Sequence, residues 1–187
     1  MSRAFFTCCI GLASFFLMVV PASASVVLKD EKIVFSPQSG GTPVSINFKG
    51  RLFKKKNGIR IDEKAKDTVA AFIHTVIEAN KTKDVNKILA LWAPSERSRL
   101  MELMSDKASM EKNSALFLNM RKSRLVGVME YGKYLLVYAL HDLVGVGDYV
   151  KLYPLLRDGD KLFMTNELSE DYFYNVIAEQ IIRYQWP

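Results

Sequence analysis

The strongest constraint on the fold is a change of hydrophobic period near the middle of the chain. Between residues 62 and 121, apolar residues recur three and four positions apart, as in amphipathic helices. From residue 125 to residue 165 they follow the period of strands, and these strands are apolar on both faces. Because such a sheet needs cover on both sides, the sequence predicts an α+β fold with helices packed on one face of an antiparallel sheet.

Four helices are expected before the strands. Asp62 is the predicted N-cap of the first helix, which runs to about residue 80, and Asp84 caps a short second helix. A third helix follows, and a fourth begins at Asp106 or Ser109. These elements should supply the cover for one face of the sheet.

The remaining elements are strands and a closing helix. Residues 32–35 and 44–48 predict an N-terminal hairpin, for which a disordered arm is the alternative. The Asp-Gly pair at 158–159 predicts a tight hairpin turn. The main strands are expected at 125–130, 133–141, 148–156 and 161–165, and a C-terminal helix is expected at 171–184.

The first 24 residues have the pattern of a secretory signal. Arg3 gives a positive start, residues 5–20 form an almost unbroken apolar run, and Ala22 and Ala24 occupy the two small positions that a signal peptidase reads. We expect cleavage after Ala24 and a periplasmic or secreted protein. A retained membrane anchor is the alternative, but the run is shorter than the roughly 20 residues of a spanning helix.

Export also limits the chemistry that we expect. Both cysteines, Cys8 and Cys9, lie in the signal segment, so the mature chain would have no thiol for a disulfide or a metal. Nucleic acids, ATP and NAD are scarce outside the cytosol, and we expect no nucleic-acid partner and no cofactor. The expected organisation is a signal peptide at 1–24, a β-rich extension at 25–60 and one domain at 61–187.

The formal net charge of +6 favours anionic partners only weakly. The charge is concentrated in a basic patch at Lys54, Lys55 and Lys56, with further arginines in the helical middle of the chain. This patch makes an envelope protein that binds anionic polymer or lipid one candidate function, with a peripheral membrane contact at most.

Candidate catalytic groups are few. The chain contains two histidines, His74 in the first helix and His141 at a strand end, and they give no metal-ligand spacing. Asp142 follows His141 directly, but neighbours on a strand point to opposite faces, so a dyad is not expected. Glu78 and Glu130 are the nearest carboxylate candidates, and each lies at an element end where water can solvate it.

Tyrosines are the more informative group. Tyr134 and Tyr138 share one strand face, and Tyr149 and Tyr153 share another. Amphipathic rings of this kind suit a pocket wall or a protein interface, although aromatic residues also favour strands for packing reasons alone. The predicted binding residues are these four tyrosines together with His74 and Trp92.

Two segments carry a resemblance to a known family. Residues 69–95, "VAAFIHTVIEANKTKDVNKILALWAPS", resemble the opening helix pair of the nuclear transport factor 2-like superfamily, in which a short helix ends in an aromatic residue and a proline. Residues 150–164, "VKLYPLLRDGDKLFM", are similar to its late strand pair. The resemblance implies a cone-shaped α+β fold with a curved sheet. Members of such families include small acid–base enzymes and many binding modules.

These observations favour an exported, non-catalytic binding or accessory module. It would recognise a protein partner or a small apolar ligand through a concave aromatic sheet, and a homodimer is compatible with the apolar strand faces. A small isomerase, lyase or hydrolase with its acid–base group in the cone is the alternative in a different class.

Overall fold

The structure is a computed structural model that describes residues 28–35, 44–172 and 174–175. The predicted signal segment and nearly all of the predicted closing helix lie outside the described residues. Two hydrogen bonds of a first helical turn are present at the start of that helix. The amide of Tyr174 donates to the side chain of Asp171, and the amide of Asn175 donates to its carbonyl.

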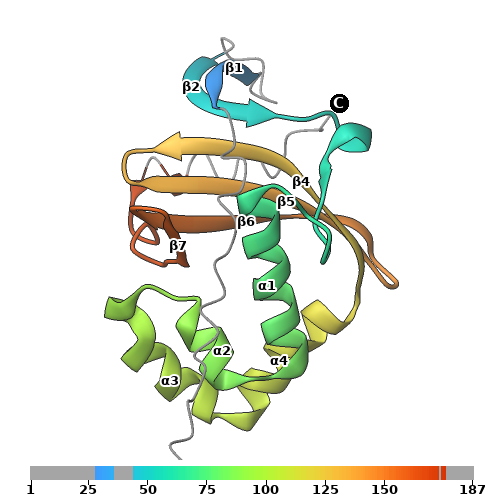
Figure 1. Ribbon diagram of the computed structural model, residues 1–187, viewed down its shortest axis with the longest axis vertical. Coiled ribbons are helices and arrows are strands. Elements are labelled where there is room, and N and C mark those ends of the chain that lie inside the picture. Colours follow the sequence, from blue (N-terminus) through green and yellow to red (C-terminus); the bar gives the residue numbers. More distant parts are fainter. Residues whose placement is uncertain (1–27, 36–43, 173, 176–187) are drawn as a thin grey trace, which may run out of the picture.

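Within the described residues, seven strands form one antiparallel sheet (Figure 1). The strand order is β1-β2-β4-β5-β6-β7, and the short β3 pairs with β4 beside β2. The hairpin predicted at the N-terminus is therefore part of the main sheet, joined to it where Gly50 pairs with Met129. The strands are β1 (Lys29–Phe35), β2 (Val44–Leu52), β3 (Ile59–Arg60), β4 (Met120–Tyr131), β5 (Tyr134–Leu143), β6 (Gly147–Asp158) and β7 (Lys161–Met164).

Four α-helices of the described chain precede the four-strand run, as predicted. They lie together on the side of the sheet away from the β1–β2 hairpin (Figure 1). They are α1 (Thr68–Thr82), α2 (Val85–Ala90), α3 (Arg97–Ser105) and α4 (Lys107–Leu118), with short 3-10 turns η1 (Lys55–Asn57) and η2 (Pro94–Glu96). Among the described residues, none of the helices has the length and apolar character needed to cross a bilayer.

The helix caps confirm two predictions and correct a third. Asp84 and Asp106 accept hydrogen bonds from the amides of Lys87 and Ser109, as N-caps do. The predicted cap Asp62 is wrong, because Asp67 caps α1 instead. Asp62 lies in the preceding turn, where its carboxylate accepts from the amide of Lys64 and forms an ion pair with Arg60 at 2.9 Å.

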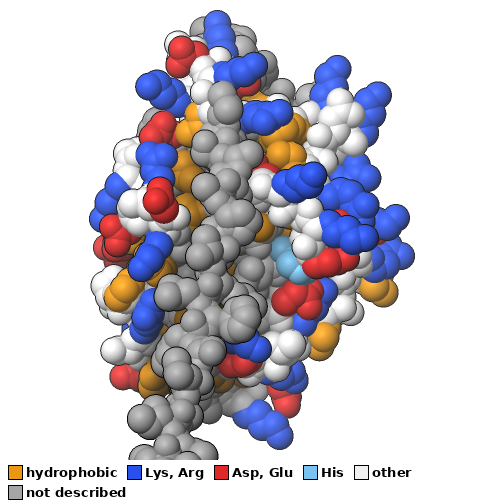
Figure 2. Space-filling view, viewed as in Figure 1, with side chains coloured by type: hydrophobic (Ala, Val, Ile, Leu, Met, Phe, Trp, Pro, Cys, Tyr) orange, Lys and Arg blue, Asp and Glu red, His pale blue; other side chains and the backbone are white. Residues whose placement is uncertain are grey.

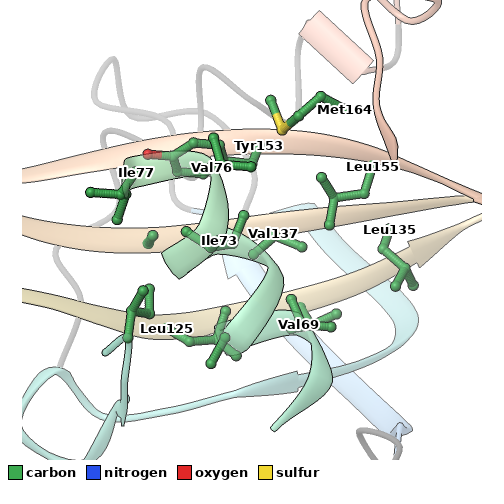
Figure 3. Packing of buried hydrophobic residues seen from close by; sticks show 14 of the residues in the cluster. Val69, Ile73, Val76, Ile77, Leu125, Leu135, Val137, Tyr153, Leu155 and Met164 are labelled. Atoms are coloured by element: carbon green, nitrogen blue, oxygen red, sulfur yellow. The ribbon is translucent and has the colours of Figure 1, made fainter. Parts of the chain in front are cut away.

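The face of the sheet that meets α1 holds the main core. Figure 3 shows Ile73, Val76 and Ile77 of α1 directed at residues of β4, β5 and β6. Val137 and Tyr153 on the sheet side have no exposed surface. The apolar residues that recur every three or four positions in α1 thus pack against those that alternate along the strands, and together they form one apolar layer.

The opposite face of the sheet holds a second cluster, as its apolar residues require. Val126, Leu136 and Tyr138 are completely buried there. Phe48 and Leu52 of β2 pack against this cluster, and so do Leu168 and Tyr174 from the segment after β7. The prediction that both faces of the sheet need cover is therefore confirmed for the described residues. Strand β2 and the segment after β7 supply the cover of the second face.

The strand start predicted at residue 125 is wrong, because β4 begins at Met120. The apolar pattern of the fourth helix also predicts that Leu118 faces inward, but this residue is 58% exposed. Leu103 of α3 is 55% exposed. In α3 and α4 the apolar residues do not form one continuous stripe, so periodicity alone could not choose the inward face.

Candidate functional site

A cavity of about 290 Å³ lies between the helices and the sheet. Residues of α1, α3 and α4 form one wall, and residues of β6 and β7 form the other. Its surface is mainly apolar. The apolar lining includes Val76, Leu100, Met104, Met110, Phe117 and Met164.

Burial shows which end of the cavity is open. Val76, Phe117 and Tyr153 are at most 4% exposed and form its deep end. Leu103 of α3 and Ser109 of α4 are exposed and lie at its rim. The cavity therefore opens to solvent near the corner between α3 and α4 and narrows toward the sheet.

One cationic side chain, Lys151, lies in the cavity wall formed by the described residues. It is half-buried on β6, on the same strand face as Tyr153. Its Nζ lies 4.7 Å from the ring centroid of Phe117 and 5.0 Å from that of Tyr153, within the range of cation–π contacts. No carboxylate among the described residues forms an ion pair with it. Burial lowers the pKa of Lys151 from its usual 10.5 to about 8.

Two asparagines add polar groups to the same cavity. The side-chain amide of Asn113 in α4 donates to Oδ1 of Asn80 in α1 at 2.6 Å. Asn80 in turn donates to the carbonyl of Val76 at 2.7 Å. This pair ties α1 to α4 and fixes the spacing of the helices that form the wall.

Behind the cavity wall, His141 joins two strands that flank its own. It is completely buried, with the Ser123 hydroxyl 2.7 Å from Nδ1 and the Tyr153 hydroxyl 3.0 Å from Nε2. The rings of His141 and Tyr153 meet edge to face, with centroids 5.8 Å apart. A neutral imidazole has one donor and one acceptor nitrogen, so the two hydroxyls have opposite roles in these bonds.

The protonation states in this group are set by burial. Burial, and secondly the charge of Lys151, lower the pKa of His141 to about 4. Burial also raises the pKa of the Tyr153 hydroxyl. At neutral pH the histidine is therefore uncharged and the tyrosine keeps its proton. Tyr153 and Lys151 can offer a hydrogen bond and a positive charge to a ligand in the cavity. Neither His141 nor Tyr153 is poised for proton transfer at pH 7.

The structure divides the predicted binding residues between different places. Tyr153 and Trp92 line the cavity. Tyr138 is completely buried in the second cluster on the opposite face, and Tyr134 at the edge of that cluster donates to Glu167 at 2.6 Å. Tyr149 is 40% exposed. The four tyrosines thus do not form one surface.

His74 lies elsewhere, in a polar groove of about 530 Å³ between α1 and the start of β4. Glu78 of the same groove pairs with Lys81 at 2.9 Å. Glu130, the other predicted carboxylate candidate, pairs with Arg157 at 2.7 Å, outside the cavity. Neither carboxylate lines the apolar cavity.

The basic patch adjoins this groove. Strand β3 places Arg60 opposite Arg124 of β4, and the Arg124 guanidinium donates to the Lys56 carbonyl at 2.9 Å. Lys54 and Lys56 are exposed, whereas the side chain of Lys55 lies outside the described residues. Figure 2 shows lysine and arginine side chains gathered along the right-hand side of this view, over the η1–β3 segment and the adjoining strand ends.

Sequence reasoning missed the most distinctive residue of the site. Lys151 lies two residues from both Tyr149 and Tyr153 on a predicted strand, so it shares the strand face of two predicted binding residues, and this signal was available. The sequence offers His141 only as a candidate at a strand end, and the structure places it in the interior with hydrogen bonds to two neighbouring strands. No signal in the sequence pointed to Ser123 or to the Asn80–Asn113 pair.

Taken together, the fold and the site define an α+β protein with a ligand-sized apolar cavity and one cation in the described part of its wall. Within the described residues, no group of three or more histidine, cysteine, aspartate or glutamate side chains could hold a metal ion. Comparison of the chain with protein-family models, curated proteins and solved structures found no match.

Proposed function

We propose that the protein is an exported, non-catalytic binding module of the nuclear transport factor 2-like type that holds a small apolar ligand in the cavity between its helices and its sheet. The cavity itself carries this proposal. At about 290 Å³ it is near the lower end of the volumes of ligand pockets, roughly 300–1,000 Å³, and its apolar lining with a few polar groups is typical of such pockets.

Two further observations support the compartment and the family in this proposal. The pattern of residues 1–24 favours export. The order of a long helix, then a short helix followed by Trp92 and Pro94, and later four consecutive antiparallel strands supports the resemblance to that superfamily.

An acid–base enzyme in the same cavity has less support. Near pH 7 the lowered pKa of His141 leaves its ring uncharged, and the raised pKa of Tyr153 keeps its hydroxyl protonated, so neither group changes protonation state there. His141 also has both ring nitrogens engaged with Ser123 and Tyr153. Glu78 and Glu130 both lie outside the cavity and are paired with cations.

The proposal can be tested by filling the cavity with a larger side chain. Met104 of α3 lines the cavity and is partly buried, whereas Met101 of the same helix is 56% exposed and does not line it. We expect Met104→Trp to weaken the binding of the uncharged fluorescent probe N-phenyl-1-naphthylamine at least about tenfold, since the indole occupies the ligand volume. The matched control Met101→Trp should bind the probe like the unaltered protein.

The measurement is a fluorescence titration of each variant, with a thermal melt to establish that each one is folded. Equal probe affinity in all three proteins would overturn the proposal, because it would place the probe on another surface. Absence of binding to the unaltered protein would overturn it as well.

A second candidate function, association with anionic polymer or lipid, is favoured by one observation. The contact of Arg124 with the Lys56 carbonyl brings the basic patch next to cations of β4. Arg60 and Arg121 are neutralised there by Asp62 and Asp142. The attraction would therefore depend mainly on exposed lysines, and salt would screen it over roughly 8–10 Å.

This candidate is tested by sedimentation with vesicles that contain phosphatidylglycerol. We expect the double variant Lys54→Glu/Lys56→Glu to sediment less than the unaltered protein at low salt, and we expect high salt to abolish the difference. Lys112→Glu, which changes an exposed lysine on α4, is the control for a change of charge away from the patch. Sedimentation that is insensitive to salt would contradict an electrostatic association through Lys54 and Lys56.

A further inference from the structure

The cavity contains a charge that the apolar ligand of the proposed function would leave without a partner. Lys151 contributes a primary amine to a wall that is otherwise apolar or uncharged within the described residues. Its charged form faces the rings of Phe117 and Tyr153, and no described carboxylate forms an ion pair with it. A partly buried cation without an anionic partner loses hydration and gains no ion pair in return.

We infer that the ligand is an amphipathic monocarboxylic acid, whose carboxylate pairs with the Nζ of Lys151 while its hydrocarbon tail lies among the apolar side chains of α3 and α4. This inference rests on the proposed function and specifies its ligand class. It follows from charge complementarity, because one cation at the sheet side of an apolar cavity matches one anion at the end of an apolar molecule.

The positions of the polar groups support this orientation of the ligand. Lys151 extends from the sheet, and the open rim carries the apolar side chains of Leu103 and Met104 with one small hydroxyl, that of Ser109. The Tyr153 hydroxyl and the side-chain NH2 groups of Asn80 and Asn113 belong to the same lining and are the donor types that a carboxylate accepts from. A tail that extends from Lys151 toward the α3–α4 corner would keep its methylene groups against apolar surface.

A phosphate or sulfate ester fits the same site less well. Its three terminal oxygens need more donors than the two of a carboxylate, and in the described lining only Lys151 carries a positive charge. An alkylamine would place two cations together. An alkyl alcohol would gain the apolar contacts but would leave the ammonium group unpaired.

The test compares three probes with the same tail and different heads: octanoate, 1-octanol and octylamine. Each is titrated at pH 7 against the full protein loaded with N-phenyl-1-naphthylamine, and displacement of the dye is measured. We expect octanoate to bind at least about tenfold more tightly than octanol, and octylamine to bind most weakly.

Two variants assign the preference to the lysine. Lys151→Met keeps the length and removes the charge, and it should abolish the advantage of octanoate over octanol while leaving octanol binding unchanged or stronger. Lys151→Arg keeps the charge and should retain the preference for octanoate. If Lys151→Met does not fold, the ranking of the three probes on the unaltered protein still decides the question.

The outcomes separate this inference from the proposed function. Equal binding of all three probes, a preference for octylamine, or displacement by none of them while the dye still binds would overturn the carboxylate inference alone. Failure of the dye and of every probe to bind would overturn the proposed function and this inference together.

Discussion

At the scale of single residues, Tyr138 and Tyr153 show how one residue type can serve two purposes in neighbouring strands. Both side chains are completely buried, but on opposite faces of the sheet. Tyr153 lines the cavity and contacts His141. Tyr138 packs with Val126 and Leu136 in the second cluster and does not reach the cavity.

The difference predicts the effect of truncating Tyr138. Tyr138→Ala should lower the free energy of unfolding by about 3–5 kcal/mol, because it removes a large ring from a packed cluster. Tyr149→Ala, the control on the next strand, removes a ring that is 40% exposed and should cost about 1 kcal/mol or less. Urea denaturation of both variants measures the difference. Similar stability of the two variants would contradict the assignment of Tyr138 to the core.

Buried His141 makes stability depend on pH in a defined window. Its pKa is about 4 in the folded protein and ordinarily 6.5, so the unfolded chain takes up a proton first as pH falls. Stability is therefore fully present above pH 6.5 and decreases between pH 6.5 and 4. The contribution of this group is about 3 kcal/mol.

The non-titrating variant His141→Gln isolates this contribution from that of the carboxylates. The free energy of unfolding, measured by urea titration at several pH values, should fall less steeply for the variant than for the unaltered protein between pH 6.5 and 4. Parallel curves for the two proteins would show that His141 is not buried in its neutral form.

At the scale of elements, the junction between the hairpin and the main sheet depends on Gly50. A Cβ atom at this position would lie 2.4 Å from the Val128 carbonyl oxygen and 2.5 Å from the Phe48 ring. The ring can rotate, but the carbonyl belongs to the backbone of the neighbouring strand. Only a glycine therefore lets β2 approach β4 at this register.

We predict that Gly50→Ala lowers the free energy of unfolding by about 1–3 kcal/mol, because the strands have to separate locally. Lys49→Ala, the exposed neighbour in β2, is the matched control and should have little effect. Thermal or urea melts report both values. An alanine variant as stable as the control would mean that β2 does not pair with β4 in this register.

The elements also show what the sequence could and could not predict. The caps Asp84 and Asp106 were predictable because each acidic residue immediately precedes a helical pattern. Asp62 has the same appearance, but its carboxylate is engaged by Arg60 and Lys64, a local competition that no periodicity reveals. The alternation along β5 correctly placed Tyr134 and Tyr138 on one face.

At the scale of the whole molecule, the site was less predictable than the fold. Alternation places Lys151 inward, but whether an inward lysine meets a carboxylate, a ring or an open cavity depends on how α4 packs over β6. The Lys151 contact with Phe117 joins residues far apart in the sequence. For the same reason, Asn80 and Asn113 could be recognised as a pair only once α1 and α4 were side by side.

Stability is unevenly distributed between the two ends of the molecule. Helix α3 buries one residue, Leu100, and its N-cap residue Glu96 makes no capping hydrogen bond. Strand β5 is buried from Leu135 to His141 and is paired on both sides. We predict that amide hydrogens of α3 exchange through local opening, while those of β5 exchange only through global unfolding.

Native-state hydrogen exchange followed by NMR at increasing denaturant concentration checks this prediction. The free energy of exchange should be lower for α3 than for β5, and only that of β5 should equal the global value. Equal protection of the two elements would contradict it. Since α3 supplies Leu103 and Met104 to the rim, its opening would also be a route into the cavity.

The contact between Tyr153 and His141 has a practical consequence. Tyr153 faces the cavity on one side and holds the imidazole on the other, so an occupant that attracts its hydroxyl proton changes the tautomer balance of His141. The sequence contains two histidines, so an imidazole nitrogen spectrum has few signals to assign. We therefore expect the nitrogen resonances of the His141 ring to shift when the cavity is filled, which would report binding without an attached label.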